Sequence, residues 1–223
     1  MIKSLCHFFP LLLCIFLITG CASRPFVDDG AAIAPQDFLI DDFSVKQTPE
    51  DCLAYRDLQV KKEFGYCVYY DDASISVNAG NDGLHFDYEL KPIYVWGNWF
   101  SIRKNTPNQF DYSSYSGVKI RLRSLTPQNV QVRVTLVDVN PNSAPYTSDE
   151  MWWCNFESLL VVDQWQVVAC PFRAFVLSAG FGARKNDGHL DPSHISAYEI
   201  SVISAPGEVT SGWMDLGFFS AYK

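Results

Sequence analysis

The stretch Val130-Gln131-Val132-Arg133-Val134-Thr135-Leu136 alternates apolar and polar side chains without interruption. The same period of two recurs over 84–90 and 118–123. Successive side chains of a strand point to opposite faces, so each stretch predicts a strand with one buried and one solvated face. Turn signals such as Asn81-Asp82-Gly83 and Thr126-Pro127 separate the stretches. We therefore expect an all-β protein built as an antiparallel β-sandwich or barrel.

Later segments continue this pattern toward the end of the chain. Trp165 alternates with Val167 and Ala169, which predicts that the indole of Trp165 lies in the core. Helical signals are weak, and the sequence allows one short helix between Pro49 and Lys62. Two more alternating sets predict strands, namely Tyr198-Ile200-Val202 and Met214-Leu216-Phe218.

The composition is acidic and rich in aromatic residues. The 223 residues include 25 acidic and 17 basic side chains, for a formal net charge of -8. An acidic surface argues against binding to nucleic acid and against electrostatic docking on anionic lipid. It does not argue against neutral ligands such as sugars. All six tryptophans lie after residue 95, which places any indole-lined site in the later part of the chain.

The first residues have the pattern of an export signal. Lys3 gives a short positive start, and the apolar run from Leu5 to Ile18 is too short to span a bilayer. The run ends in Ile18-Thr19-Gly20-Cys21, which resembles the lipobox of bacterial lipoproteins. This resemblance implies that Cys21 is acylated and becomes the mature N-terminus, held on the membrane by several acyl chains. The alternative is an ordinary secretory signal followed by an unrelated cysteine.

This interpretation divides the chain into three parts. A lipoprotein signal peptide covers 1–20, a lipidated N-terminus and tether covers 21–36, and one domain covers 37–223. Pro25, Gly30 and Pro35 without any periodic pattern favour a tether. We expect a cell-envelope protein anchored to a membrane through its lipid. Ala22 resembles the residue that sorts lipoproteins to the outer membrane in Gram-negative bacteria.

Four cysteines remain in the expected domain, at positions 52, 67, 154 and 170. An even number in an oxidising compartment predicts two disulfides, for which three pairings are possible. Proximity in the sequence favours Cys52–Cys67 and Cys154–Cys170. A zinc site is the rival interpretation, but the cysteines form no C-x-x-C pair and no histidine is near them.

Five short stretches together carry a resemblance to a known fold family. They are 39–43 (LIDDF), 83–88 (GLHFDY), 111–120 (DYSSYSGVKI), 163–172 (DQWQVVACPF) and 212–216 (GWMDL). Their order resembles the galactose-binding-like jelly roll of carbohydrate-binding modules, above all family 11, with the complex-I-intermediate-associated domain as a relative. The resemblance implies a jelly-roll β-sandwich that holds polysaccharide along a concave sheet.

A sugar site needs aromatic faces beside polar side chains, because pyranose rings present C–H patches and hydroxyl groups together. Trp152 and Trp153 are adjacent, so in a strand they point to opposite faces. We expect Trp153 to face outward and Trp152 to share the face of Cys154. Arg121 and Arg133 are expected on the polar faces of neighbouring strands, where a solvated sheet face is the alternative. The candidate sugar contacts are Trp96, Trp99, Tyr146, Trp153, Arg121, Arg133 and Asp138, with a core position as the alternative for Trp96 and Trp99.

The resemblance also points to a structural calcium ion near the chain ends. Asp41, Asp42 and Asp215 match the positions that it implies. Calcium takes six to eight oxygen ligands, several of them backbone carbonyls. Simple exposed acids are the alternative interpretation of these residues.

The sequence favours binding over catalysis. Adjacent acids such as Asp149-Glu150 would point to opposite faces of a strand, whereas glycosidases need two acids that face each other across a bond. No Gly-x-Ser-x-Gly elbow and no dinucleotide fingerprint occurs. We expect a non-catalytic lipoprotein that binds a polysaccharide or oligosaccharide. The alternatives are an envelope assembly or interaction protein with a protein partner, and a polysaccharide-active enzyme.

Overall fold

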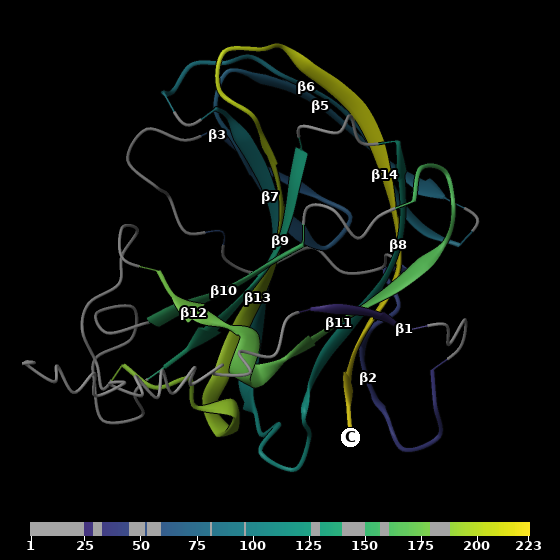
Figure 1. Ribbon diagram of the computed structural model, residues 1–223, viewed down its shortest axis with the longest axis vertical. Coiled ribbons are helices and arrows are strands. Elements are labelled where there is room, and N and C mark those ends of the chain that lie inside the picture. Colours follow the sequence, from purple (N-terminus) through teal and green to yellow (C-terminus); the bar gives the residue numbers. More distant parts are fainter. Residues whose placement is uncertain are drawn as a thin grey trace, which may run out of the picture.

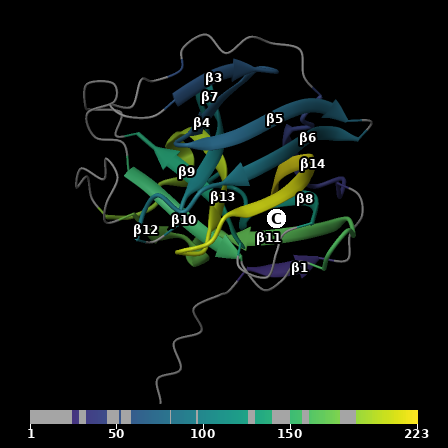
Figure 2. The same ribbon diagram turned by 90° about the horizontal axis from the view of Figure 1, so that it is seen from above.

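The protein is a sandwich of two antiparallel sheets, seen from two directions in Figure 1 and Figure 2. The computed structural model describes residues 25–28, 33–44, 52, 59–80, 82–95, 97–125, 130–139, 150–156, 161–178 and 188–223. Within these residues the regular elements are strands and two single 3-10 turns, η1 (Phe172–Ala174) and η2 (Pro192–His194). No helix in the described part is long and apolar enough to cross a membrane.

Seven strands form each sheet. In Figure 2 the main strands of sheet A descend through the picture in their spatial order, from β5 to β1. Sheet A runs β1 (Phe26–Asp28), β11 (Gln166–Pro171), β8 (Gly117–Leu125), β14 (Thr210–Tyr222), β6 (Gly83–Leu90) and β5 (Ala73–Gly80), and β2 (Phe38–Asp41) also pairs with β14. Sheet B runs β12 (Val176–Leu177), β10 (Glu150–Phe156), β9 (Val130–Asp138), β13 (Ile195–Ser204), β7 (Trp99–Phe110), β4 (Tyr66–Tyr70) and β3 (Gln59–Glu63).

The alternating stretches form strands whose apolar side chains meet between the sheets, as predicted. In β9 the core takes Val130, Val132, Val134 and Leu136, while Gln131 and Arg133 stay partly exposed. Facing them from sheet A is a second apolar layer that removes both inner faces from water. That layer includes Leu84, Phe86, Tyr88 and Leu90 of β6 and Val118, Ile120 and Leu122 of β8.

Two apolar alternations run differently from the prediction. In β14 a bulge between Leu216 and Phe218 shifts the register, so the core takes Phe219 and Ala221 after Leu216. In β11 the core-facing residues are Val168 and Cys170. Trp165 therefore lies on the outer side of sheet A, and the prediction that it is a core residue was wrong. The cause is that Val167 and Ala169 are also buried, and a strand buried on both faces carries no usable alternation.

The order of the strands corrects the expected neighbourhood of Arg121 and Arg133. Arg121 belongs to β8 in sheet A, and Arg133 belongs to β9 in sheet B. The chain changes sheets between 125 and 130, so strands that follow each other in sequence lie in opposite layers. The two arginines consequently face away from each other on opposite sides of the sandwich.

Two segment boundaries also differ from the sequence-based expectation. Residues 59–63 form β3 and pair with β4, so the predicted helix does not reach its expected end at Lys62. Residues 26–28, predicted to lie in the tether, form β1 at the edge of sheet A beside β11. Cys21 and the predicted signal peptide lie outside the described residues.

The cysteines follow half of the predicted pairing. Cys52 and Cys67 form a disulfide, as expected. Cys154 and Cys170 are free buried thiols, so the second predicted disulfide is absent. They come from β10 and β11 in opposite sheets, not from neighbouring strands, and both point into the core. Burial and a hydrogen bond with Cys154 raise the pKa of the Cys170 thiol well above its usual value, which keeps it protonated.

A buried carboxylate ties the two sheets together. Asp41 at the end of β2 in sheet A accepts hydrogen bonds from the Tyr66 hydroxyl at 2.9 Å and the Tyr198 hydroxyl at 2.5 Å. Both tyrosines come from sheet B. Lys104 Nζ lies 2.5 Å from the same carboxylate oxygen and supplies the opposite charge. A buried charge that is paired and hydrogen-bonded in this way specifies how the layers align.

We predict that Gly83→Ala is far more damaging than Gly207→Ala. Both glycines have positive φ, but a Cβ at Gly83 would lie 1.8 Å from the Leu216 carbonyl oxygen, whereas nothing lies within 4 Å of one at Gly207. Backbone strain alone should cost Gly207→Ala about 1–2 kcal/mol. Gly83→Ala adds a backbone clash between β6 and β14 and should cost about 3 kcal/mol or more. Urea unfolding of the two variants checks this, and equal losses would contradict it.

Candidate functional site

The outer face of sheet B is the side of its strands that points away from the core, and it holds most of the predicted sugar contacts that the structure describes. Strand register sets its side chains in rows. One row across β4, β7, β13, β9 and β10 consists of Tyr69, Ser101, Ser201, Arg133 and Asn155. The next row consists of Cys67, Arg103, Glu199, Thr135 and Trp153.

Trp153 and Arg133 meet at the β9–β10 end of this face. Trp152 points into the core and Trp153 points outward, as predicted from their adjacency. The Arg133 guanidinium carbon lies 3.8 Å from the centroid of the Trp153 ring, in a cation–π stack. Arg133 also donates to Asn155 Oδ1 at 2.7 Å and to Gln131 Oε1 at 3.2 Å. A partly exposed indole is thus held beside planar groups that can donate to and accept from hydroxyls.

The middle of the outer face of sheet B is buried although it points away from the core. Arg103 and Glu199 form an ion pair at 3.0 Å, and their side chains are only 3% and 8% exposed. Tyr69 is 1% exposed. Cys52 is bonded to Cys67, which holds Cys52 against this face. The described part of this face therefore has no continuous row of exposed aromatic rings along which a polysaccharide could lie, in contrast to what the resemblance to carbohydrate-binding modules had implied.

The other predicted sugar contacts are scattered. Trp99 begins β7 and lies partly exposed on the outer face of sheet B, three strands from Trp153, which is about 14 Å across the sheet. Asp138 is 2% exposed and accepts a hydrogen bond from the Asp191 backbone N–H at 2.9 Å, so it fastens the η2 loop and is not an accessible contact. Trp96 and Tyr146 lie outside the described residues.

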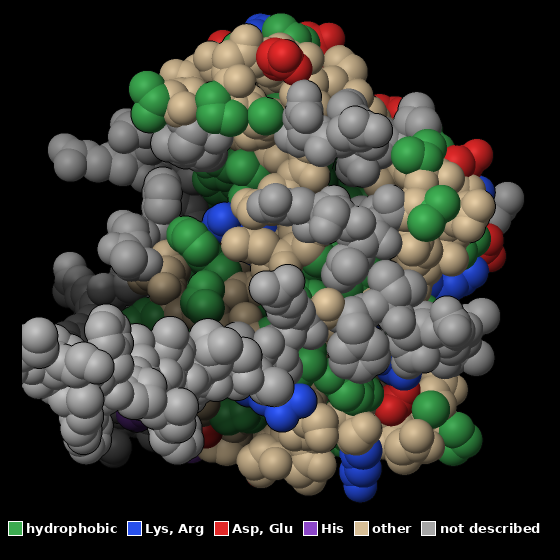
Figure 3. Space-filling model, in the orientation of Figure 1, with side chains coloured by type: hydrophobic (Ala, Val, Ile, Leu, Met, Phe, Trp, Pro, Cys, Tyr) green, Lys and Arg blue, Asp and Glu red, His purple; other side chains and the backbone are tan. Residues whose placement is uncertain are grey.

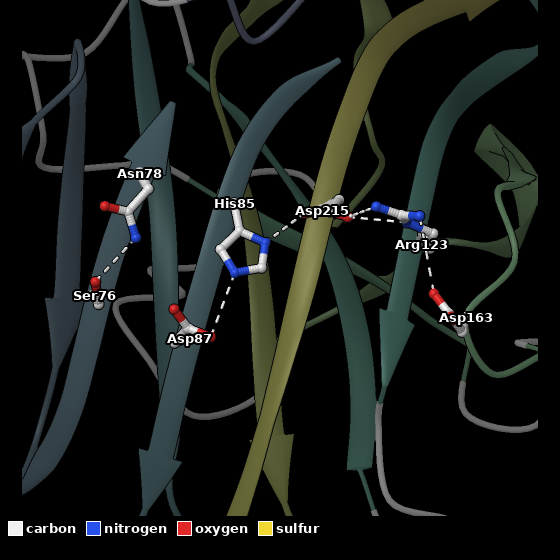
Figure 4. A network of polar contacts seen from close by, with 7 residues as sticks. All are labelled: Ser76, Asn78, His85, Asp87, Arg123, Asp163 and Asp215. Atoms are coloured by element: carbon white, nitrogen blue, oxygen red, sulfur yellow. Dashed lines mark hydrogen bonds and ion pairs between the residues drawn. The ribbon is translucent and has the colours of Figure 1, made fainter. Parts of the chain in front are cut away.

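A second polar cluster lies on the outer face of sheet A (Figure 4). Register places Asn78, His85, Asp215 and Arg123 side by side on β5, β6, β14 and β8. Asp215 Oδ1 lies 2.6 Å from His85 Nδ1, and Asp215 Oδ2 accepts from Arg123 Nε at 3.0 Å and from Nη2 at 2.7 Å. Asp87 lies 3.3 Å from His85 Nε2. The carboxylate of Asp215 therefore holds a histidine and an arginine in fixed positions.

Sequence reasoning did not single out His85 or Arg123. Each lies at a polar position of an alternating strand. Many solvated side chains lie at such positions, so the pattern does not distinguish these two residues. Only strand register reveals that Asp215 stands between them. Arg121, which was predicted, lies on this same face and stacks on Trp165, with its guanidinium carbon 4.0 Å from the ring centroid.

The three acids predicted to bind calcium do not form one site. Asp215 is engaged with His85 and Arg123 on the outer face of sheet A. Asp41 points into the sandwich toward Lys104 and two tyrosine hydroxyls. Asp42 accepts from Ser44 N and Oγ, which lowers the pKa of its carboxyl. Asp41 and Asp215 each already have a cationic side chain beside them, which disfavours a shared calcium ion. Among the described residues, no group of three or more His, Cys, Asp or Glu side chains could hold a metal ion.

The face of the molecule drawn in Figure 3 is mixed in charge. Acidic side chains are visible at the top and along the right side of the space-filling view, with basic side chains between them (Figure 3). This distribution fits the net charge of -8 and leaves no broad basic surface in that view.

Several solved structures with this fold are carbohydrate-binding modules. A family 11 module of a cellulosomal cellulase of Clostridium thermocellum superposes with a TM-score of 0.56 at 15% identity, covering 86% of this chain and 97% of the module. A family 11 module from the same organism, in complex with a β-1,3-1,4-mixed-linked tetrasaccharide, gives 0.53 at 15% identity, with 85% and 97% covered. A family 30 module of that organism gives 0.50 at 14% identity, with 84% and 98% covered.

These likenesses are likenesses of fold. No known protein family matches the sequence, and no curated protein is found to match it. The chain therefore has the jelly-roll fold of these carbohydrate-binding modules over nearly their whole length, as the resemblance of its five short stretches predicted.

We predict that His85 stabilises the protein more at acidic than at alkaline pH. Burial lowers the pKa of His85, but the hydrogen bond and charge of Asp215, aided by Asp87, outweigh burial and raise it above its ordinary value. Because the pKa of His85 is higher in the folded than in the unfolded protein, the protonated imidazole stabilises the fold. This contribution is complete below about pH 6.5, the pKa of an unperturbed histidine, and is lost as the pH rises through the folded-state pKa. The difference in unfolding free energy between wild type and His85→Asn should shrink from about pH 6 to about pH 9. A constant difference across this range would show that the protonated form is not favoured.

Proposed function

We propose that this protein binds carbohydrate without transforming it, through the β9–β10 end of the outer face of sheet B. The observation that carries the proposal is the fixed group of Trp153, Arg133, Asn155 and Gln131 on a fold shared with carbohydrate-binding modules. An indole beside guanidinium and amide groups offers both an apolar surface for a sugar ring and partners for its hydroxyls.

The geometry favours weak binding to a short length of a glycan chain. Trp99 begins β7 and Trp153 lies on β10, three strands away, and the buried Ser201 of β13 lies between them. The two partly exposed indoles therefore do not form one continuous platform. A single aromatic contact contributes about 1.5–3 kcal/mol through burial. The overall affinity for a polysaccharide would then rise when many copies of the protein on one surface bind the same glycan, and not through a long groove in a single copy.

Binding alone is also what the acids on the two outer faces favour. Glu199 is paired with Arg103, and Asp215 is paired with Arg123. A general acid for glycoside hydrolysis needs an open position opposite a second acid, and these two carboxylates are already engaged by arginines. A β-glucan or another plant or microbial polysaccharide is the ligand class that we propose.

We predict that Trp153→Ala lowers the affinity for the bound polysaccharide by about tenfold, which corresponds to about 1.4 kcal/mol. Trp153 is partly exposed and packs on Arg133, so its removal takes away ring contact without opening the core. Affinity gels containing mixed-linkage β-glucan, xylan, galactomannan or other polysaccharides measure this retention. Val209→Ala serves as the control, since Val209 is an exposed apolar side chain in the β13–β14 connection.

Other outcomes would overturn the proposal. Equal retention of Trp153→Ala and wild type would place the contact elsewhere. Release of reducing ends from the retained polysaccharide would make the protein an enzyme. If the protein binds no glycan on an array and specifically captures one envelope protein, the alternative of an assembly protein would be favoured.

The proposed location is the cell envelope, with the domain held on a membrane by lipid on Cys21. The motif Ile18-Thr19-Gly20-Cys21 supports this proposal. We predict that Cys21→Ser shifts the protein in its native host from the membrane fraction to the soluble fraction, because it removes the acylated thiol. Incorporation of labelled fatty acid into wild type and not into Cys21→Ser is the direct measurement. Membrane association of the variant at the wild-type level would contradict the anchor.

A further inference from the structure

The outer face of sheet A contains a pocket of about 390 Å³ that the proposed function does not use. Small-molecule sites in proteins have volumes of about 300–1,000 Å³, so this pocket suits a small ligand. The row of His85, Asp215 and Arg123 described above lies on one side of it, and Trp165 lines it as well. At its other side are residues of the β5–β6 hairpin, including Asn78 and Gly80.

Glycines on neighbouring strands lie in and beside the lining of the pocket. Gly80 on β5 pairs with Gly83 on β6, one row beyond His85. A Cβ at Gly83 would come within 3.2 Å of the Cα of Gly217 on β14, so the three glycines adjoin. At Gly217 a Cβ would meet Arg121 Nη1 at 3.0 Å and Trp165 Cζ3 at 3.2 Å. The absence of side chains here lets Arg121 and Trp165 lie close against the sheet.

The aromatic and cationic side chains on this face contact one another in a continuous series. Arg121 stacks on Trp165 at 4.0 Å, and the Arg123 guanidinium carbon lies 5.3 Å from the centroid of Trp165 and 5.4 Å from that of Trp213. His85 lies beside Trp213 with centroids 6.0 Å apart. Asp215 binds both Arg123 and His85, and its side chain is only 12% exposed. The polar groups are therefore held in place before any ligand arrives, which reduces the entropy lost on binding.

The chemistry of the lining favours a neutral polyhydroxyl ligand. Arg123 and Asn78 offer donors, carboxylates offer acceptors, and Trp165 offers an apolar ring. A phosphate or sulfate would meet several carboxylates, and an ammonium group would meet two guanidinium groups. The charges in and around the pocket are those of Asp82, Asp87, Asp163 and Asp215 against Arg121, Arg123 and His85.

We infer that this pocket binds a neutral saccharide of one or two rings, as a second site on the opposite sheet from the Trp153 group. A pocket of this volume accommodates one or two sugar rings, either a free sugar or a short part of a chain. The inference does not depend on the proposed function of sheet B, because no residue is shared between the two sites.

The test uses tryptophan-indole and histidine NMR signals of the purified protein during titration with sugars. Glucose, galactose, mannose, N-acetylglucosamine, cellobiose and lactose are the neutral probes, and glucosamine and glucose 6-phosphate are the charged ones. At least one neutral probe should shift the Trp165 and His85 signals in a saturable way. The dissociation constant obtained from these shifts should be lower for that probe than for either charged probe. Trp165→Ala should weaken that binding by about tenfold, and Asn78→Phe, which places a ring in the pocket from exposed β5, should abolish it.

Two comparisons separate this site from the one on sheet B. Trp153→Ala should leave the affinity for the monosaccharide or disaccharide within about twofold of wild type, whatever happens to polysaccharide retention. Absence of any shift at Trp165 and His85 with all neutral probes would overturn the inference. Binding that survives both Trp165→Ala and Asn78→Phe, or binding of the charged probes alone, would also overturn it.

Discussion

Burial of two apolar sheet faces against each other is the constraint from which the rest of this structure follows. The strands of the sandwich have two faces, and the core takes one of them. The Asp41 carboxylate, bonded to Tyr66 and Tyr198 across the layers, sets how the sheets align. What remains for recognition is the pair of outer faces, and each carries an arginine stacked on a tryptophan.

The two outer faces are built by the same means but offer different shapes. On sheet B the Cys52–Cys67 disulfide holds Cys52 against the outer face, and Arg103 and Glu199 are buried there as an ion pair. The accessible part is left at the β9–β10 end. On sheet A, Gly217 lets Arg121 and Trp165 lie close against the sheet, and Trp165 and the β5–β6 hairpin line a pocket. Filling one face and hollowing the other therefore decides which kind of ligand each can hold.

Likeness to carbohydrate-binding modules explains the scaffold and not the details of its surface. At about 15% identity the modules share the layers and strand order with this chain. Surface side chains contribute little to the core, so they vary freely while the fold persists. The function of this chain must accordingly be argued from its own tryptophans and arginines. The buried Cys154 and Cys170 thiols, by contrast, belong to packing.

Alternation in the sequence was sufficient to predict an all-β protein and several of its strands, and adjacency was sufficient to predict that Trp152 and Trp153 point to opposite faces. These are local properties, since a period of two follows from strand geometry alone. The choice of a sandwich over a barrel came from the resemblance of five short stretches. The sequence could not show that β8 and β9 lie in different sheets, that Trp165 leaves the core, or that Asp215 stands between His85 and Arg123. Those facts depend on pairing between residues far apart in the chain, on a one-residue bulge at Gly217 and on a strand buried on both faces. Tertiary structure alone decides them, because register is fixed by the whole sheet and not by any one segment.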